Sequence, residues 1–316
     1  MVLEALKSLF GTRIRLPRDQ MSRIPRAARK AAEPQVAALQ AAIDEIAALP
    51  GLADVANTKK LPKGFFAAVQ AMVAAYDAYV AVIVEHTPAL KGAPRAGTPE
   101  GYRACHEQPV GVTGVEGLHI YRAIRPWKDF PQVAKELART GEQQFKDVQA
   151  LHTGKDPDKI SMTGAAVQQG RLNFAQRGEL CPLLDPATHR CRAWDVRPFA
   201  CRMHFVLTDP TWSDPRDPHY PRQVKAFNVR MPIRQQLALM QIEKRMLLNA
   251  VPFLNANVLQ WLHLAEGGAL AEVGEAPVRF APDGQAAVKA NRNNPGAKKF
   301  EKAKQNKQNK QRKKRK

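Results

Sequence analysis

The sequence predicts a mainly α-helical protein, with a helical N-terminal hairpin, a loop-rich cysteine-cluster domain with flanking helices, and a disordered basic tail. Three observations predict this class. Apolar residues recur at intervals of three and four along two long stretches, alanine is abundant, and aromatic residues make up only 7% of the 316 residues. This pattern favours helices over sheets. With 44% apolar residues, the chain can form one large domain or two modest ones.

The first two helices are predicted from their apolar rows. One row follows Pro34, and Pro50 and Gly51 end its helix. A second helix is expected over 64–86, and a loop through Pro62 joins the two into an antiparallel hairpin. The rows consist of Val36, Leu39, Ile43 and Ile46 in the first helix, and of Phe66, Val69, Val73, Tyr76, Val80 and Ile83 in the second.

Residues 65–84 are apolar enough to require a test as a membrane span. They have the length of a span, but Asp77 lies near their middle. A charged residue at that depth costs about 2.5–3.5 kcal/mol, which roughly cancels the gain from the apolar residues. We therefore expect a buried helix and no membrane span.

The rest of the chain begins after a stretch rich in helix breakers. Residues 87–99 hold three prolines and two glycines, which makes them the best internal boundary. We predict a basic N-terminal segment at 1–33, the hairpin and its linker at 34–99, a cysteine-cluster metal-binding domain at 100–288, and the tail at 289–316. Within 100–288 we expect helices at 110–122, 131–151, 232–250 and 254–265, and loops at 153–169, 178–208 and 208–221.

The net charge of +20 is concentrated in the tail. Residues 289–316 hold 13 Lys and Arg against one Glu, so they carry +12 and the remainder carries +8. So few apolar residues cannot offset the entropy of ordering, and we expect disorder. This charge favours weak, salt-sensitive contact with RNA, DNA or ribosomes. A solubilising appendage is the alternative, and no protein partner is predicted.

The first 30 residues favour a cytoplasmic location. They hold eight Lys and Arg without a continuous apolar region, so no secretory signal is expected. An organelle transit peptide is the alternative, although Pro17 and Pro25 would interrupt an amphipathic helix. Because cytoplasmic thiols stay reduced, cysteines there are expected to be ligands, nucleophiles or buried thiols before disulfides.

Three of the four cysteines lie within 21 residues. Nine residues separate Cys181 from Cys191, and nine more separate Cys191 from Cys201. Such clustering favours a metal centre, because thiolates hold zinc ions and iron–sulfur clusters. The gaps are longer than those of zinc knuckles, so loops must bring the thiols together. Cys105 is the remaining cysteine and completes a set of four.

Two alternatives to a metal centre remain open. The thiols can be buried without a ligand, or one of them can be a nucleophile activated by a histidine. Numerous arginines flank the cysteines, and an arginine can lower a thiol pKa or donate to sulfur. The histidines that could activate a nucleophilic cysteine are His106, His189 and His204. The residues that we predict beside the metal centre are Arg197, Arg202 and Trp194, which would shield it.

Two segments carry a resemblance to a known family. The run CPLLDPATHRCRAWDVRPFACR resembles the signature of the YkgJ-type cysteine-cluster family, a zinc- or iron-chelating domain family. Upstream, RACHEQPVGVTGVEGLHI is similar to the family's double-cysteine element. The resemblance covers about residues 101–205, a third of the chain. Matching positions are Cys105, His106, Val110, Val112, Thr113 and Glu116 upstream, and Cys181, Leu183, Leu184, Asp185, Cys191, Trp194, Arg197, Pro198, Cys201 and Arg202 downstream.

The resemblance implies metal chelation. His106 stands where the family has a second paired cysteine, so the ligands are either four thiolates or three thiolates with His106 or His204 substituting. One family branch resembles flagellin lysine methylases, which makes a protein-modifying enzyme the alternative to a structural or redox centre. We favour the metal-binding module, because the chain lacks a glycine-rich nucleotide fingerprint; whether it is an enzyme stays open. We favour an iron–sulfur cluster over Zn²⁺ because long loops and arginine donors surround the predicted ligands Cys105, Cys181, Cys191 and Cys201.

Overall fold

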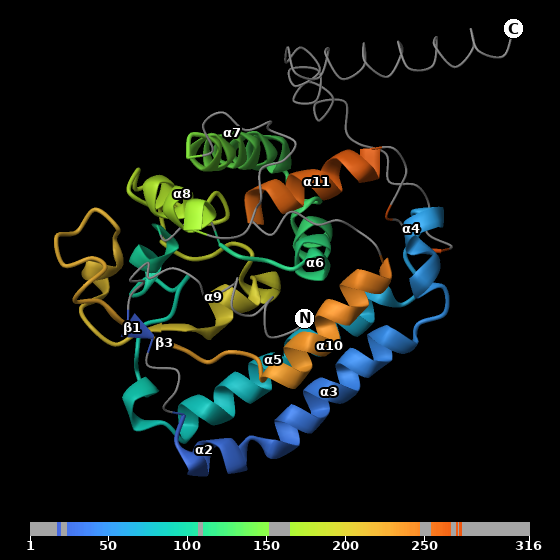
Figure 1. The fold of residues 1–316 in the computed structure, drawn as a ribbon, viewed down its shortest axis with the longest axis horizontal. Coiled ribbons are helices and arrows are strands. Elements are labelled where there is room, and N and C mark those ends of the chain that lie inside the picture. Colours follow the sequence, from blue (N-terminus) through green and yellow to red (C-terminus); the bar gives the residue numbers. More distant parts are fainter. Residues whose placement is uncertain are drawn as a thin grey trace, which may run out of the picture.

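The structure is a computed structural model that describes residues 18–19, 24–106, 110–151, 165–246, 254–266, 270 and 272–273. Its described part is mainly helical, which confirms the predicted class (Figure 1). The predicted tail at 289–316 and most of the predicted basic segment at 1–33 lie outside the described residues.

One group of helices is built around the predicted pair. Helix α3 (Glu33–Ala48) and helix α5 (Phe65–Glu85) run in opposite directions and pack against each other (Figure 1). Helix α2 (Arg26–Ala31) contacts α5, and helix α10 (Ile233–Met246) contacts α3. The short elements η2 (Leu52–Asp54) and α4 (Val55–Thr58) connect α3 to α5. Helix α3 ends just before Pro50, as predicted, and Gly51 then adopts a positive φ of 80°.

Helix α5 forms the centre of this group, and most of its predicted apolar row is buried. The Glu272 carboxylate accepts hydrogen bonds from the amides of Gly64 (3.1 Å) and Phe66 (2.9 Å), where the helix has free N–H groups. Among the described helices, α5 is by itself long and apolar enough to cross a membrane, and 44% of its most apolar window is buried inside the protein. Core helices of water-soluble proteins meet the same criteria, so this gives only weak support for a span.

A second group comprises α6 (Gly114–Ile124), α7 (Phe130–Gln149), α8 (Ala165–Ala175) and α11 (Leu254–Glu266). Helix α11 contacts α6 and α7, and α7 contacts α8. The side chains of Thr113 and Glu116 form a capping box at the start of α6. The prediction of a loop at 153–169 was wrong for residues 165–169, which belong to helix α8. Residues 153–164 lie outside the described residues. Packing against α7 overrides the polar local sequence there.

Short elements occupy the two predicted loops at 178–208 and 208–221. They are η6 (Trp194–Val196), α9 (Phe199–Met203), β2 (His204–Val206) and η7 (Pro210–Ser213). Strand β3 (Lys225–Asn228) lies between β2, to which it is antiparallel, and β1 (Arg18–Asp19), to which it is parallel. Phe205 pairs with Phe227. The predicted loops were wrong at these short elements. Strand β2 was missed because a strand of three residues carries no readable period and pairs across a long sequence separation.

The breaker-rich linker is attached to the later part of the chain. After η3 (Pro88–Leu90), Arg95 forms an antiparallel bridge with Phe205. The Val206 amide donates to the Pro94 carbonyl at 2.9 Å, and the Ala96 amide donates to the His204 carbonyl at 3.3 Å. These bonds cross the predicted division between 99 and 100, and the division itself stays a prediction.

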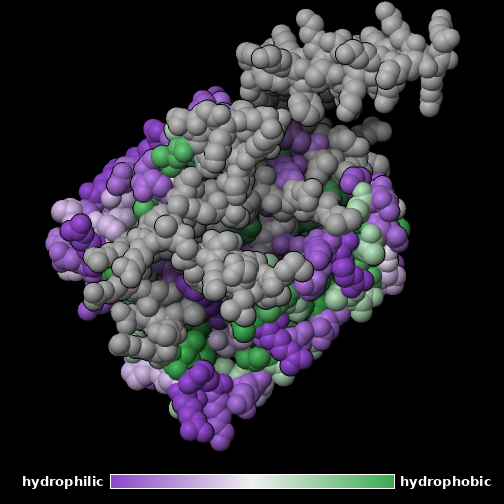
Figure 2. All heavy atoms as spheres, viewed as in Figure 1, coloured by the Kyte–Doolittle hydropathy of each residue, from purple (hydrophilic) through white to green (hydrophobic). Residues whose placement is uncertain are grey.

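The surface in this orientation is mainly hydrophilic where described residues are visible. Figure 2 shows hydrophobic residues among hydrophilic ones on the side where α3 and α10 lie. On α10 the exposed apolar side chains are Ile233, Leu237 and Met240. Their opposite neighbours, including Leu239 and Ile242, are buried in the core.

Candidate metal centre

The four predicted ligands come from three segments. Cys105 lies in η4 (Tyr102–His106), Cys181 and Cys191 flank a tight loop, and Cys201 lies in α9. All four are free thiols and all are partly buried.

A hairpin-like loop places Cys181 and Cys191 near each other. The Leu184 amide donates to the Cys181 carbonyl at 2.9 Å, and Leu184 forms an antiparallel bridge with Cys191. At the tip, the Asp185 amide donates to the Arg190 carbonyl at 2.8 Å. The nine-residue gap is therefore folded back on itself, as the sequence argument required.

Gly97, in the linker, forms hydrogen bonds with two of the cysteines. Its carbonyl accepts from the Cys191 amide at 2.9 Å, and its backbone hydrogen-bonds to the Cys105 thiol. Gly97 has φ +83°, and a Cβ placed on it would lie 2.9 Å from the Cys191 Cβ. Both the left-handed backbone and this close approach require glycine.

The thiols interact electrostatically as one group. Burial raises the pKa of Cys201 well above its ordinary value, and Cys105, Cys181 and Cys191 raise it further. Burial also raises the pKa of Cys105, with added contributions from Cys181 and Cys191. Negative thiolates thus oppose one another, a cost that a cation among them would remove.

Two of the thiols also have donors that favour the thiolate form. Burial raises the pKa of Cys191, while a backbone hydrogen bond from Ala193 and the charge of Arg197 lower it. The Gly97 backbone and Arg197 lower the pKa of Cys105 in the same way. Donors to sulfur are what a bound thiolate needs around it.

The described residues contain no group of three or more His, Cys, Asp or Glu side chains arranged to hold a metal ion. The four thiols thus interact electrostatically, but no three of them are arranged around one point in the part of the chain that the structure describes.

Both ring nitrogens of His106 lie near groups other than the thiols. Its ring is buried, and Nδ1 lies 2.9 Å from the Gly178 carbonyl oxygen, to which it donates as the N–H tautomer. Its Nε2 lies 3.9 Å from the Asp214 carboxylate. Burial lowers the pKa of His106, while Asp214 raises it. Substitution of a thiolate by His106 finds no support in these contacts.

His204, the second substitute ligand, starts β2. Its Nδ1 lies 2.9 Å from the Asn228 side-chain oxygen. Its Nε2 is buried without a hydrogen-bond partner among the described residues. The ring is thus fixed through Asn228, and one nitrogen remains unused. His189, the third histidine considered, stacks on Tyr102 with ring centroids 4.0 Å apart.

Arg202 is a fully buried connector between α5 and the cysteine segment. Its Nε donates to the Arg197 carbonyl at 2.7 Å, and its other two nitrogens donate to the Asp77 carboxylate and the Asp195 carbonyl. The positive charge of Arg202 also lowers the pKa of Cys191. Its own carbonyl accepts from Arg95 at 2.9 Å. All of its nitrogens are thereby used on the scaffold, so Arg202 acts on the thiols through its charge.

Arg197 and Trp194, also predicted beside the centre, lie against each other. The Arg197 guanidinium carbon is 3.3 Å from the centroid of the Trp194 ring. Arg197 is buried, whereas Trp194 is 37% exposed. Burial, together with the charges of Arg95 and Arg202, lowers the pKa of Arg197 to about 10, so it remains a cation at neutral pH.

Helix α6 contacts the cysteine segment through Glu116. The buried Glu116 carboxylate accepts from the Phe199 amide at 2.5 Å, which fixes the start of α9. The Phe199 ring packs edge-on against Tyr76, with centroids 4.7 Å apart. These contacts hold Cys201 between the two helix groups.

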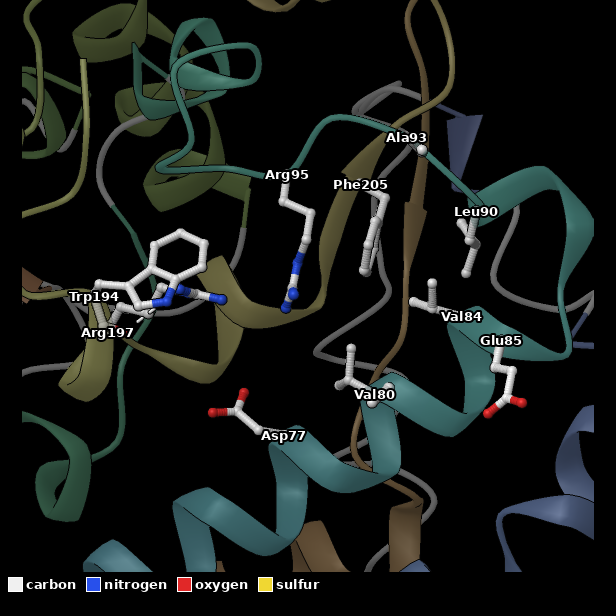
Figure 3. A pocket seen from close by; sticks show the side chains of 12 residues that line it. Asp77, Val80, Val84, Glu85, Leu90, Ala93, Arg95, Trp194, Arg197 and Phe205 are labelled. Atoms are coloured by element: carbon white, nitrogen blue, oxygen red, sulfur yellow. Dashed lines mark hydrogen bonds between the residues drawn. The ribbon is translucent and has the colours of Figure 1, made fainter. Parts of the chain in front are cut away.

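A pocket of about 480 Å³ opens beside this segment (Figure 3). Residues of α5 form its floor, and the linker and β2 form its other walls. Arg95 and Arg197 extend into one end, above Asp77, while Glu85 points away at the other (Figure 3). The remaining walls are mostly apolar, formed by Val80, Ala81, Val84, Leu90, Ala93 and Phe205.

The fold and the site define a mainly helical protein with four free thiols gathered beside a pocket. No family model matches the chain, and no curated protein or solved structure matches it. The resemblance to the cysteine-cluster family therefore rests on the sequence motif alone.

Three residues important to this arrangement were not identified from the sequence. Asp77 was considered only as an obstacle to membrane insertion, although a lone carboxylate in an apolar helix also signals a buried partner. Gly97 and Arg95 lie in the breaker-rich linker, where glycine and arginine give no distinguishing signal.

Proposed function

We propose that the protein binds a metal centre, an iron–sulfur cluster in preference to Zn²⁺, on Cys105, Cys181, Cys191 and Cys201. One observation carries the proposal: four free thiols from three separate segments form one electrostatic group. Without a ligand these thiols stay protonated and uncharged, because their pKa values are raised, whereas a metal cation among them would stabilise the thiolate forms. The motif resemblance to the YkgJ-type family supports the same assignment.

Zinc and a four-iron cluster need different distances between the four sulfurs. Four sulfurs bound to one zinc ion at about 2.3 Å lie only about 3.8 Å from one another. A four-iron cluster binds each thiolate to a different iron, so its ligands stay farther apart. We favour the cluster because long loops and arginine donors surround the four cysteines.

The surroundings suit a negatively charged centre. Backbone hydrogen bonds reach Cys105 from Gly97 and Cys191 from Ala193, and the charge of Arg197 lowers the pKa of both thiols. When bound, a cluster would supply either a rigid link between the segments or a one-electron redox site. In either role the residues of this chain fix the thiolates, balance their charge and limit access of water.

Anaerobic purification, followed by an optical spectrum and analysis for iron, acid-labile sulfide and zinc, tests the proposal. We expect visible absorption from thiolate-to-iron charge transfer, with iron and sulfide in equal amounts. A colourless protein with one equivalent of zinc contradicts the cluster but keeps the metal centre. Protein free of both metals contradicts the metal centre.

Single substitutions identify the ligands. Cys201→Ser should abolish the cluster, and the corresponding change at each other cysteine should do the same. Ala200→Ser is the matched control, because it adds a hydroxyl at the neighbouring position of α9. His106→Gln should leave the metal content unchanged, since the ring faces Gly178 and Asp214. Loss of metal in this variant would instead support the set of three thiolates and one imidazole.

The finer organisation is proposed with this function. The chain would consist of the basic segment 1–33, the hairpin and linker 34–99, the cysteine-cluster region 100–288 and a disordered tail at 289–316. We also propose a cytoplasmic location and weak RNA, DNA or ribosome contact through the tail, because the tail carries +12 and the cysteines are free thiols. A protein-modifying enzyme of the methylase-like branch remains the alternative.

A further inference from the structure

The pocket beside the cysteine segment combines an apolar chamber with a cationic end. Val80, Val84 and Phe205 line the chamber, and the Arg95 and Arg197 guanidinium groups enter at the end nearest Asp77 (Figure 3). Its volume of about 480 Å³ falls in the range of small-molecule sites. Walls of this kind suit a ligand that is apolar over most of its length and charged at one end.

The two guanidinium groups retain unused donors. The Nε atoms of Arg95 and Arg197 are buried, and neither finds a hydrogen-bond partner among the described residues. Arg197 is only 3% exposed, so bulk water does not replace the missing acceptor. Buried polar groups are normally satisfied, and an exception beside a pocket calls for an acceptor in the pocket.

Neighbouring carboxylates do not fill this need. Asp77 interacts electrostatically with both arginines, but its hydrogen bond is to Arg202. Glu85 lies at the far end and points away (Figure 3). Three guanidinium groups therefore share one carboxylate, which leaves this end of the pocket positive and excludes a cationic ligand.

We infer that this pocket binds a small organic anion, a monocarboxylate with an apolar chain. Its carboxylate would accept from the Nε–H groups of Arg95 and Arg197, in the geometry that arginine offers to carboxylates. The chain would lie along Val80, Val84 and Phe205. This inference goes beyond the metal centre and stands on the pocket alone, although Arg197 would place the ligand beside the cysteine group.

Calorimetric titration with octanoate, octanol and octylammonium tests the inference on the full-length protein. We expect octanoate to bind at least tenfold more tightly than octanol, the ratio expected for a charge-assisted hydrogen bond, and octylammonium not to bind. Equal affinity for octanoate and octanol, or no binding of octanoate, would overturn the inference.

Two variants place the ligand in the pocket. Arg95→Gln should weaken octanoate binding about tenfold or more, whereas Arg29→Gln, an exposed position on α2, should not change it. Ala81→Trp fills the chamber from an exposed position on α5 and should also abolish binding, which keeps the test decisive if Arg95→Gln does not fold. Unchanged affinity in Ala81→Trp refutes the assignment.

Metal analysis of the same samples separates this inference from the proposed function. Octanoate binding by protein without iron or zinc would contradict the metal centre only. Metal-loaded protein that ignores octanoate would contradict the pocket inference only.

Discussion

Replacement of Arg202 by methionine tests whether this buried arginine holds the cysteine segment onto α5. The side chain is fully buried and donates to the carbonyls of Arg197 and Asp195 and to the Asp77 carboxylate. Methionine preserves much of the packing but leaves the buried Arg197 carbonyl without its donor, at about 1–3 kcal/mol, and also the carbonyl of the exposed Asp195, at less because water reaches that residue. Asp77 is 43% exposed, so water solvates it and its lost ion pair adds little. Removal of a buried charge offsets part of this cost, and we expect a net loss of about 2 kcal/mol.

Urea unfolding followed by far-ultraviolet circular dichroism measures this loss as a lower midpoint at constant slope. Arg192→Met is the matched control from the same segment. Arg192 forms two 2.7 Å bonds to Asp129, but both side chains are substantially exposed, at 32% and 49%. Its loss should cost less than about 1 kcal/mol. Equal destabilisation by the two substitutions would show that burial of Arg202 does not organise the segment.

Three further predictions follow from single features. Gly97→Ala should abolish binding at the proposed metal centre, because its Cβ would meet the Cys191 Cβ at 2.9 Å; metal analysis measures the loss. His119→Leu should flatten the acid side of the stability profile. Burial, with the charges of Arg202 and Arg122, lowers the pKa of His119 to about 4 from 6.5, so the native protein resists protonation that the unfolded chain accepts. Stability should therefore fall by up to about 3 kcal/mol as the pH drops from 6.5 to 4, and denaturant titrations across this range should show the drop only with His119 present. Removal of 289–316 should eliminate retention on immobilised RNA at low salt, because it removes +12 of charge.

Each of these three predictions has a control variant or a result that would contradict it. Gly92→Ala carries the same backbone strain, with φ +73°, but its Cβ would meet nothing within 4 Å, so metal should be retained. Metal loss in both variants would point to strain in the linker and not to contact with Cys191. An unaltered pH profile in His119→Leu would mean that other groups govern acid stability. RNA retention that survives truncation would place the contact on the folded body.

Regular helices were predictable because their signals are local. The apolar row that predicted a helix over 64–86 gave α5 at Phe65–Glu85, and Pro34 and Pro50 marked the limits of α3. Helix α8 was missed because its stability comes from packing against α7. The strands were missed because β2 and β3 contain only three and four residues and pair across 20 positions or more.

The cysteines could be identified from the sequence, but their surroundings could not. Cysteine spacing indicated that loops must bring the thiols together, and Cys105 and Cys201 interact electrostatically with the other thiols. Their role as metal ligands stays a prediction. The partners that fix them come from elsewhere: Gly97 and Arg95 from the linker, Asp77 from a helix. No short-range pattern links a carboxylate at 77 to an arginine at 202. Only the packed fold brings them into contact.

The backbone bonds of the linker have a practical consequence for dissecting the protein. A fragment beginning at residue 100 would keep every cysteine yet lose the Gly97 carbonyl that receives the Cys191 amide and the Pro94 carbonyl that receives the Val206 amide. It would also lose the Asp77 carboxylate opposite Arg202. Such a truncation would remove the contacts of the cysteine segment with the linker and with α5. The shortest fragment that retains the four thiols and folds by itself must therefore include α5.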